Sequence, residues 1–344
     1  MLHYLWMVQV GIIGASGFTG AELLRLSAQH PHLDVRVATG DTQAGSRAAD
    51  LYPSLAAAYP QLTFSTYDRA EVAGLDLVFL GLPHGASQAI VPELVGKVGH
   101  LVDLAADFRL RDPALYPQWY GEEHTAPELL ADFAYGLPEL YRDEIRAADH
   151  VATPGCYPTA AALALAPLVR AGAVETNGII VDAASGVSGA GRPPKPNTTF
   201  CAVDEDFTAY GLLDHRHTPE MEQVLGASVL FTPHLAPMNR GILATCYARP
   251  TGATSTGALL ELQRTAYAEE PFVVVLEGSP STKATLGSNC AHVTARYDDR
   301  TGWVVAIAAI DNITKGASGA AVQCANLLLD LPETTGLPIA GVFP

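Results

Sequence analysis

A glycine-rich turn near the start of the chain constrains the fold more than any other feature. Residues 8–13 form a short apolar run, and residues 21–30 form a helical pattern of leucines that stops before Pro31. In a strand–turn–helix unit of this kind, free backbone N–H groups and the helix dipole hold a pyrophosphate. The turn has the spacing G-x-x-G-x-x-G and predicts a dinucleotide site, although similar turns also occur without a ligand. The residues predicted to contact the dinucleotide are Gly14, Ser16, Gly17, Phe18, Thr19 and Gly20.

The apolar runs that follow this turn predict a doubly wound α/β domain. Runs at 35–38, 75–82 and 101–104 are separated by polar or helix-forming stretches, which is typical of a parallel sheet covered on both faces. We therefore expect residues 1–155, together with about 316–344, to form a Rossmann-type nucleotide-binding domain.

The remaining segment, residues 156–315, predicts an α+β domain. It begins with an Ala/Leu helix near 159–171, and residues 298–302 form a good hairpin turn. A last helix near 317–329 is expected to return to the first domain. The strands expected in the second domain are 178–184, 229–232, 242–248, 292–297 and 303–310.

Composition narrows the class of partner. A formal net charge of −16 over 344 residues argues against nucleic acid and against an anionic membrane surface, since both need clustered Lys and Arg. A small-molecule substrate is the better hypothesis. The sequence contains no apolar run of the roughly 18–20 residues that would span a bilayer, and residues 1–7 lack the Lys or Arg of a signal peptide. We expect a cytoplasmic protein.

Cys156 is the candidate nucleophile. It lies in the segment T-P-G-C-Y-P-T at a predicted helix start, where unpaired N–H groups and the helix dipole favour the thiolate. The alternative is a buried structural thiol, which we expect for Cys201, Cys246, Cys290 and Cys324. The five cysteines are scattered and contain no C-x-x-C pair, so no disulfide framework or zinc site is predicted. Beside a nicotinamide, a thiolate implies thioester reduction, which interconverts an activated acid and an aldehyde.

Two histidines are candidates for the proton shuttle. His215 and His217 precede a predicted helix with Thr218 as N-cap and Pro219 at its first position. An imidazole that titrates near neutrality can take a proton from the thiol and return it later. A purely structural role in a capped helix is the main alternative. A metal site is not predicted, because H-x-H lacks a third ligand at a characteristic spacing.

Two segments are candidate anion ligands. The small-residue loop 185–192 offers exposed amides, hydroxyls and one guanidinium, although a flexible linker is the plain alternative. Arg109 follows the predicted strand at 101–104 and is our candidate for a substrate phosphate, since ligands bind at the carboxyl ends of such strands. The loop residues predicted to bind substrate are Ser185, Ser188, Gly189 and Arg192.

The choice between NAD and NADP stays open from the residues alone. Asp41 lies 21 residues after Gly20, near the position of an NAD-selecting acid, but it follows a glycine. A 2′-phosphate could instead be held by Ser16, Thr39, Ser46 and Arg47.

Taken together, these segments resemble the N-acetyl-γ-glutamyl-phosphate reductase family of arginine biosynthesis, which is related to aspartate-semialdehyde dehydrogenase and glyceraldehyde-3-phosphate dehydrogenase. The resemblance spans nearly the whole chain. Its motifs lie at 14–20, 82–85, 107–109, 135–139, 154–159, 185–192, 215–220, 240–243 and 309–317.

The resemblance implies a role for several of these residues. Cys156 matches the family's nucleophile, and the acid/base lies in the H-R-H-x-P-E segment, with His217 ranked ahead of His215. It further implies NADP, an acyl-phosphate substrate, a glyceraldehyde-3-phosphate-dehydrogenase-like second domain, and a homodimer or homotetramer assembled through that domain. Glu220 would contact substrate. The residues expected on the cofactor side are Pro83, Asn312, Lys315 and Gly316.

Departures from the family pattern are few, and two rival functions remain. Gly40 and Asp41 replace the Ser/Arg-type sequence that often follows the second strand, while Ala105 and Ala106 stand where a serine is frequent. One rival is the lysine-pathway reductase that acts on an acidic carrier protein, which a chain of charge −16 would repel. The other is an inactive nucleotide-binding regulator, against which Cys156 and the paired histidines count.

Overall fold

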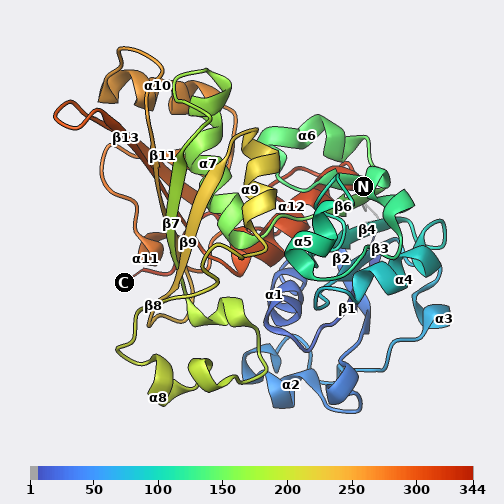
Figure 1. Cartoon of the computed structure of the whole chain (residues 1–344). Coiled ribbons are helices and arrows are strands. Elements are labelled where there is room, and N and C mark those ends of the chain that lie inside the picture. Colours follow the sequence, from blue (N-terminus) through green and yellow to red (C-terminus); the bar gives the residue numbers. More distant parts are fainter. Residues whose placement is uncertain (1–6, 344) are drawn as a thin grey trace, which may run out of the picture. The chain divides into compact units, whose positions relative to one another are not determined.

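A computed structural model describes residues 7–343 of the chain (Figure 1). Residues 1–6, whose composition argued against a signal peptide, lie outside the described part. The chain divides into two compact units. The first unit contains residues 7–116, 122–154 and 317–337, and the second contains 117–121, 155–316 and 338–343. In the described part of the chain, no helix is both long and apolar enough to cross a bilayer.

The first unit is built on a six-stranded sheet with the order β2-β1-β3-β4-β6-β5. All neighbouring strands are parallel. The strands are β1 (Val8–Ile13), β2 (Leu33–Ala38), β3 (Leu77–Leu80), β4 (His100–Asp103), β5 (Phe133–Tyr135) and β6 (His150–Ala152). The helices before the second unit are α1 (Phe18–Ser27), α2 (Ala48–Leu51), α3 (Arg69–Val72), α4 (Ser87–Leu94), α5 (Leu115–Tyr120) and α6 (Pro138–Arg146). The 3₁₀ turns among them are Asp41–Gln43, Pro53–Leu55 and Pro127–Asp132.

The glycine-rich turn lies at the point where the strand order reverses. Strands β2 and β3 pair with opposite edges of β1, and the turn follows the carboxyl end of β1, where ligands bind in folds of this kind. Gly14 has φ +86, and a Cβ there would lie 2.4 Å from the carbonyl oxygen of Gly81. A Cβ on Gly20 would lie 2.4 Å from the Cα of Ala15. The two glycines therefore let α1 and the β3 end approach the turn closely.

Helix α12 (Gly319–Leu328) completes the first unit. It packs on α1, α6 and β4, and nearly all of its side chains are buried. The helix is preceded by a π-helical turn, Thr314–Ser318, which shifts its start two residues beyond the predicted one. At the turn's end, the Ser318 hydroxyl donates to the carbonyl of Thr19, 2.8 Å away, and so joins the start of α12 to the start of α1.

The second unit contains a seven-stranded mixed sheet with the order β11-β12-β13-β10-β7-β9-β8. The predicted hairpin at 298–302 is confirmed, since Asp298 pairs with Trp303 across β12 and β13. The strands are β7 (Ile179–Ser185), β8 (Thr208–Ala209), β9 (Val229–Leu235), β10 (Ile242–Ala248), β11 (Val273–Val275), β12 (Ala291–Asp298) and β13 (Trp303–Ile310). The helices are α7 (Cys156–Arg170), α8 (Phe200–Val203), α9 (Thr218–Leu225), α10 (Thr256–Ala266) and α11 (Thr282–Thr285), with 3₁₀ turns at Val187–Ala190 and Pro196–Thr198.

Helix α7 forms the core of the second unit. Its alanines allow it to pack closely on β10 and β13, with α9 and α10 beside it. Pro167 cannot donate the helical hydrogen bond to the carbonyl of Leu163. The hydroxyl of Tyr267 donates to that carbonyl instead, 2.7 Å away, so the buried polar group stays satisfied. The helix that begins at Cys156 is thus fixed by packing, since all of its residues from Tyr157 to Leu168 are buried.

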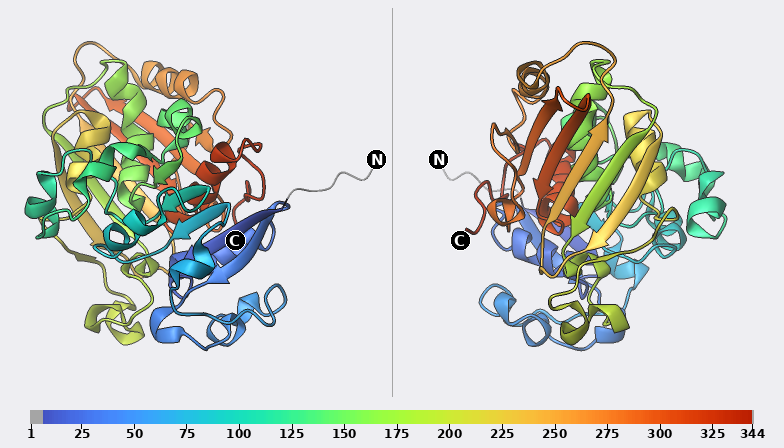
Figure 2. Two further views of the ribbon diagram at one scale, coloured as in Figure 1. Left: turned by 90° about the vertical axis from the view of Figure 1, so that its right-hand side faces the viewer. Right: turned by 60° about the vertical axis from the view of Figure 1, so that its left-hand side comes forward.

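Within residues 7–343, the opposite face of this sheet carries no helix (Figure 2). In the right-hand view of Figure 2 the strands face the viewer with nothing in front of them. Along β7 and β10, fully buried side chains alternate with half-buried ones, among them Leu243 and Tyr247. Apolar side chains are therefore partly open to solvent across this face.

Candidate active site

Cys156 lies at a helix start, as predicted, but α7 begins at Cys156 itself, three residues before the predicted start, and Gly155 is the N-cap. Its side chain is half-buried, while Cys246, Cys290 and Cys324 are buried. The prediction of a buried Cys201 is wrong, because this residue lies exposed on the short helix α8. The first amides of α7 lack helical partners, and the aligned peptides of its 15 residues place positive potential at the sulfur. The position of Cys156 at the N-terminus of α7 thus favours its thiolate form over the thiol.

His217 lies directly against the residue before the cysteine. A Cβ on Gly155 would lie 2.4 Å from His217 Nε2 and 2.6 Å from its Cε1. Gly155 has φ −65 and ψ 154, which any residue can adopt, so glycine is needed here for space. Helix α9 begins at Thr218, and His217 is its N-cap. The prediction of Thr218 as N-cap and Pro219 as first helical residue was therefore wrong by one position.

His215 lies in an aromatic cage. Its ring packs edge-on against Tyr157, Tyr210 and Phe231, at centroid distances of 5.6, 5.6 and 5.2 Å. Burial lowers the pKa of His215 to about 4, and Arg216 acts in the same direction. His215 Nδ1 accepts a hydrogen bond from the amide of His217, 3.1 Å away, which requires that this nitrogen be unprotonated. His215 is thus a neutral, structural ring at pH 7.

Glu220 is fully buried, and its carboxylate holds the start of α7. The amide of Gly155 donates to Glu220 Oε1 over 2.8 Å. Because this amide lies at the N-cap of α7, the contact ties α9 to the residue that precedes Cys156. Within the second unit, Glu220 thus fixes the position of the backbone next to Cys156.

The loop 311–316 lies on another side of Cys156. A Cβ on Gly316 would lie 2.7 Å from the Cβ of Cys156. Asn312 is buried, and its side chain accepts from the amide of Gly241 over 2.7 Å and donates to Ser188 Oγ over 3.0 Å. Lys315 is also fully buried, with Nζ 5.7 Å from the centre of the Phe272 ring. Its side chain therefore points into the interior of the second unit.

The small-residue loop 185–192 is held in place by backbone hydrogen bonds. The amides of Gly186, Val187 and Ser188 donate to the carbonyls of Gly241, Met238 and Asn239, respectively. The amide of Gly189 donates to the carbonyl of Gly186. These amides were expected to be exposed anion ligands; the structure corrects this, because carbonyl oxygens already occupy them. The same contacts argue against a flexible linker. The hydroxyls of Ser185 and Ser188 and the half-buried Arg192 remain candidates.

Arg109, in the first unit, follows β4 in a turn organised by two carboxylates. Its guanidinium donates to the carbonyl of Leu104 over 2.8 Å. Burial, and then the carboxylate of Asp107, raise the pKa of Asp103 to about 7. Burial opposes ionisation of Asp107, but hydrogen bonds led by that from His84 lower its pKa to about 2. Ser87 Oγ bridges the two carboxyls at 3.0 and 2.8 Å, which suits a protonated Asp103 beside an ionised Asp107.

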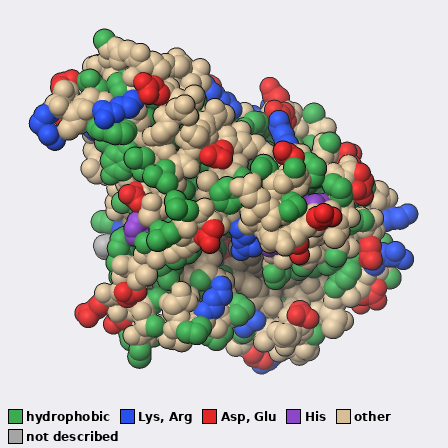
Figure 3. All heavy atoms as spheres, in the orientation of Figure 1, with side chains coloured by type: hydrophobic (Ala, Val, Ile, Leu, Met, Phe, Trp, Pro, Cys, Tyr) green, Lys and Arg blue, Asp and Glu red, His purple; other side chains and the backbone are tan. Residues whose placement is uncertain are grey.

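The glycine-rich turn uses two predicted hydroxyls to fix its own shape. Thr39 Oγ1 accepts from the amide of Gly14 over 3.1 Å, and Ser16 Oγ donates to the carbonyl of Gly40. Helix α1 begins at Phe18 with no side-chain cap and no acid in its first turn. Its first amides therefore remain for an anion, while Pro83 lies exposed after β3. Arg47 is paired with Asp50 at 2.7 Å. On the face shown in Figure 3, Lys and Arg side chains are interspersed with Asp and Glu.

Comparisons with known proteins place the chain in a family. Residues 9–148 match the semialdehyde dehydrogenase NAD-binding domain, and residues 156–312 match the semialdehyde dehydrogenase dimerisation domain. The N-acetyl-γ-glutamyl-phosphate reductase of Symbiobacterium thermophilum is 50% identical over 98% of this chain and 99% of its own length. That of Desulforudis audaxviator is 47% identical over 98% and 100%.

The chain belongs to the N-acetyl-γ-glutamyl-phosphate reductase family. The resemblance stated from the motifs is thereby confirmed. The structure of aspartate semialdehyde dehydrogenase II from Vibrio cholerae has a TM-score of 0.71 at 16% identity, covering 94% of this chain and 98% of its own, and shows that the fold is shared. The structure of aspartate semialdehyde dehydrogenase with NADP from Candida albicans scores 0.69 at 15% identity, over 94% and 99%. The predicted fold class, a Rossmann-type sheet with an α+β second domain, is also confirmed.

In this reductase-family chain, the second unit brings together residues from three separate segments, at 155–156, 217–220 and 311–316. Cys156 begins α7, and Gly316 lies against its side chain. His217 lies against Gly155, and Glu220 binds the amide of Gly155. Neither Tyr210 nor the space at Gly155 was predicted from the sequence. A glycine directly before the nucleophile, Gly155, could have indicated a close contact there, but the contacting residue, His217, lies more than 60 residues away in the sequence.

Proposed function

We propose that this protein reduces N-acetyl-γ-glutamyl phosphate with NADPH to N-acetyl-glutamate 5-semialdehyde, NADP and phosphate, a step of arginine biosynthesis, through a thioester on Cys156. The observation that carries the proposal is the position of Cys156 at the start of α7, beside His217. Relatives at 47 and 50% identity carry the name of this reductase. The lysine-pathway reductase and an inactive regulator have no comparable support.

The chain's own residues account for the acyl transfer. Cys156 Sγ forms a bond to the acyl carbon while the bond from that carbon to the phosphate oxygen breaks, so that phosphate leaves and a thioester remains. His217 first accepts the thiol proton and later donates a proton to the developing oxyanion. When the thiohemiacetal collapses, its hydroxyl proton returns to His217, the carbon–sulfur bond breaks, the aldehyde leaves and the thiolate is restored.

His217 is the better candidate for the acid/base. It lies against Gly155, next to the nucleophile. His215 has a pKa lowered to about 4 by burial and a ring enclosed by three aromatic side chains, so it cannot donate a proton readily at pH 7. We infer that His215 orients His217 through the hydrogen bond to its amide.

The glycine-rich turn is suited to hold the cofactor. The close approach at Gly14 and the uncapped start of α1 leave backbone amides for a pyrophosphate, with Ser16, Gly17, Phe18, Thr19 and Gly20 lining the turn. When bound, NADPH supplies the hydride that the thioester needs. Pro83, Asn312 and Gly316 stay as predicted contacts. Because the Lys315 side chain is buried, only the backbone of Lys315 is retained as a candidate.

Four side chains and one glycine remain candidate substrate ligands. Arg109 is our candidate for the phosphate, and Ser185, Ser188, Gly189 and Arg192 for the rest of the substrate. Glu220 is fully buried and bound to the amide of Gly155, so we now assign it to holding Cys156 in place rather than to direct substrate contact.

The reverse reaction tests the function directly. The purified protein should reduce NADP in the presence of N-acetyl-glutamate 5-semialdehyde, and the absorbance of NADPH should rise only when phosphate or arsenate is present. Arsenate is a useful control, because the acyl arsenate that forms hydrolyses and so drives oxidation of the semialdehyde to completion. A rate independent of either anion would exclude acyl-phosphate chemistry.

We further propose that two or four copies assemble through the open face of the second sheet. The match to a dimerisation domain and the half-buried apolar side chains on β10 support this assignment. Leu243→Glu should place a charge in the interface and shift the mass in light scattering down to the 36.2 kDa of one chain. Ala258→Glu, on the exposed side of α10, is the matched control and should leave the mass unchanged. An unaltered oligomer in Leu243→Glu would contradict the proposal.

A further inference from the structure

We propose that Asp311 and Arg240 are positioning residues, which hold the loop 311–316 as a wall against Cys156 and so fix the direction from which its sulfur attacks. The inference rests on the proposed function in one respect, namely that Cys156 is the nucleophile. Neither residue was a predicted site residue, and neither is placed among the catalytic groups above.

The wall is a contact between Gly316 and the side chain of Cys156. A Cβ added to Gly316 would lie 2.7 Å from Cys156 Cβ and 3.2 Å from its Cα, both closer than van der Waals contact allows. The Cα of Gly316 therefore already touches the cysteine side chain. A movement of this loop changes the space available to the Cys156 side chain and hence the orientation of its sulfur.

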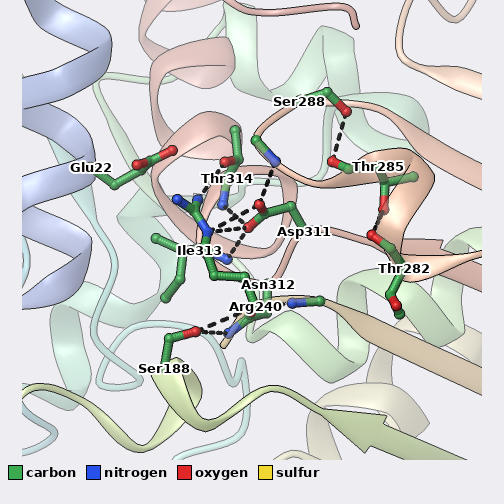
Figure 4. Close-up of polar contacts among 12 residues, drawn as sticks. Glu22, Ser188, Arg240, Thr282, Thr285, Ser288, Asp311, Asn312, Ile313 and Thr314 are labelled. Carbon is green, nitrogen blue, oxygen red and sulfur yellow. Dashed lines mark hydrogen bonds and ion pairs between the residues drawn. The ribbon is translucent and has the colours of Figure 1, made fainter. Parts of the chain in front are cut away.

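Asp311 fixes the conformation of the loop 311–316 by hydrogen bonds within the loop. It is fully buried, and its Oδ1 accepts from the amides of Ile313 and Thr314, over 2.8 and 3.0 Å (Figure 4). The backbone carbonyl of Asp311 accepts from the amide of Gly316 over 2.9 Å. One residue thus determines the path of the chain up to the glycine that touches Cys156.

The same carboxylate anchors the loop to two other segments of the second unit. The amide of Gly287 donates to Asp311 Oδ2 over 2.7 Å, and Arg240 Nε lies 3.1 and 3.0 Å from the two carboxylate oxygens. A second nitrogen of Arg240 donates to Thr314 Oγ1 over 2.8 Å. The guanidinium thus spans both ends of the turn, a geometry that the single ammonium of lysine cannot reproduce.

A buried carboxylate is stable only while its partners stay in place. Asp311 has partners on both oxygens, from backbone amides and a guanidinium, so moving any of them would leave charge unpaired in a dry interior. The loop is therefore rigid where it meets Cys156. Since a misplacement of about 1 Å in an attacking group can lower the rate about 100-fold, such rigidity favours reaction without contact to the substrate.

Three variants test the proposal. Asp311→Asn keeps the size but turns an NH₂ group toward N–H donors. Arg240→Lys keeps the positive charge but loses the planar guanidinium, whose separate nitrogens bind Asp311 and Thr314. Arg264→Met is the matched control, because Arg264 forms an ion pair of 2.9 Å with Glu277 on an exposed part of α10 in the same unit.

We expect Asp311→Asn to lower kcat about 100-fold while KM changes less than about threefold. Acylation of Cys156 by p-nitrophenyl acetate, followed as a burst of p-nitrophenol, should slow about tenfold, since attack on a carbonyl also needs a directed sulfur. Arg240→Lys should give intermediate losses and Arg264→Met none. Peptide mass mapping separates Cys156 from the exposed Cys201.

The proposal is overturned if folded Asp311→Asn keeps kcat and the acylation rate within about threefold of the original protein. If Asp311→Asn does not fold, Arg240→Lys decides: slower acylation at unchanged KM supports the positioning role, and unchanged acylation refutes it. If the original protein does not reduce the acyl phosphate, the proposed function fails. The acylation burst, which needs neither cofactor nor acyl phosphate, then still decides the positioning role.

Discussion

Cys156→Ser is expected to lower kcat by about 10³-fold or more while the protein stays folded, because a hydroxyl at this position remains protonated and attacks an acyl carbon far more slowly than a thiolate. Serine replaces one atom at the first position of α7, so the packing of that helix is preserved. The measurement is the steady-state rate of NADP reduction, with the circular dichroism of both proteins compared.

Cys201→Ser is the matched control for this experiment. Cys201 is an exposed cysteine on α8, and its replacement should leave kcat within about twofold. In the original protein, the acyl phosphate without NADPH should add the mass of one acyl group to the peptide that contains Cys156. Retention of a tenth or more of the activity in Cys156→Ser, or an adduct on another residue, would refute the thioester mechanism.

Gly155→Ala is expected to lower kcat about 100-fold by displacing His217. The backbone at Gly155 accepts any residue, but the new methyl group would lie 2.4 Å from His217 Nε2 and 2.8 Å from its Cδ2. The imidazole must therefore move away from the start of α7. Because neither Gly155 nor His217 is among the residues proposed to contact the cofactor, the dissociation constant for NADPH should not change.

Gly257→Ala supplies the comparison for the added methyl group. Gly257 is exposed in α10, and no contact closer than 3.9 Å would meet its Cβ, so alanine should stabilise the helix by about 0.5–1 kcal/mol and leave kcat unchanged. If Gly155→Ala retains full kcat, His217 is not the acid/base at this position.

Local patterns were sufficient to predict much of this protein. The turn at 14–20 follows β1, and β10 and β13 have the predicted bounds, because alternating or continuous apolar runs bounded by glycine leave few alternatives. Cys156 was placed at a helix start by its own neighbours in the sequence, since glycine and proline mark such a start. The family resemblance then named the reaction, and the comparisons confirmed it.

Other expectations failed where a partner distant in the sequence decides the environment. The amides of 186–189 were expected to bind an anion, but carbonyls near 238–241 occupy most of them. Lys315 was expected on the cofactor side, and because its side chain is buried near Phe272, only its backbone stays a candidate. Cys201 was expected in the core and lies at the surface. Composition could not distinguish these outcomes, because burial depends on which segments meet.

The sequence by itself therefore determined the two kinds of sheet, the glycine turn and the nucleophile at a helix start, all of which depend on residues within a few positions of one another. Only the tertiary structure decided that His217 fills the space left by Gly155, that His215 is enclosed by aromatic rings, and that Asp311 and Arg240 hold Gly316 against Cys156. The contacts of Gly155 with His217 and of Cys156 with Gly316 join residues that are 62 and 160 positions apart in the chain. Packing of α7 against its own sheet and α9 creates them, and no local pattern encodes such packing.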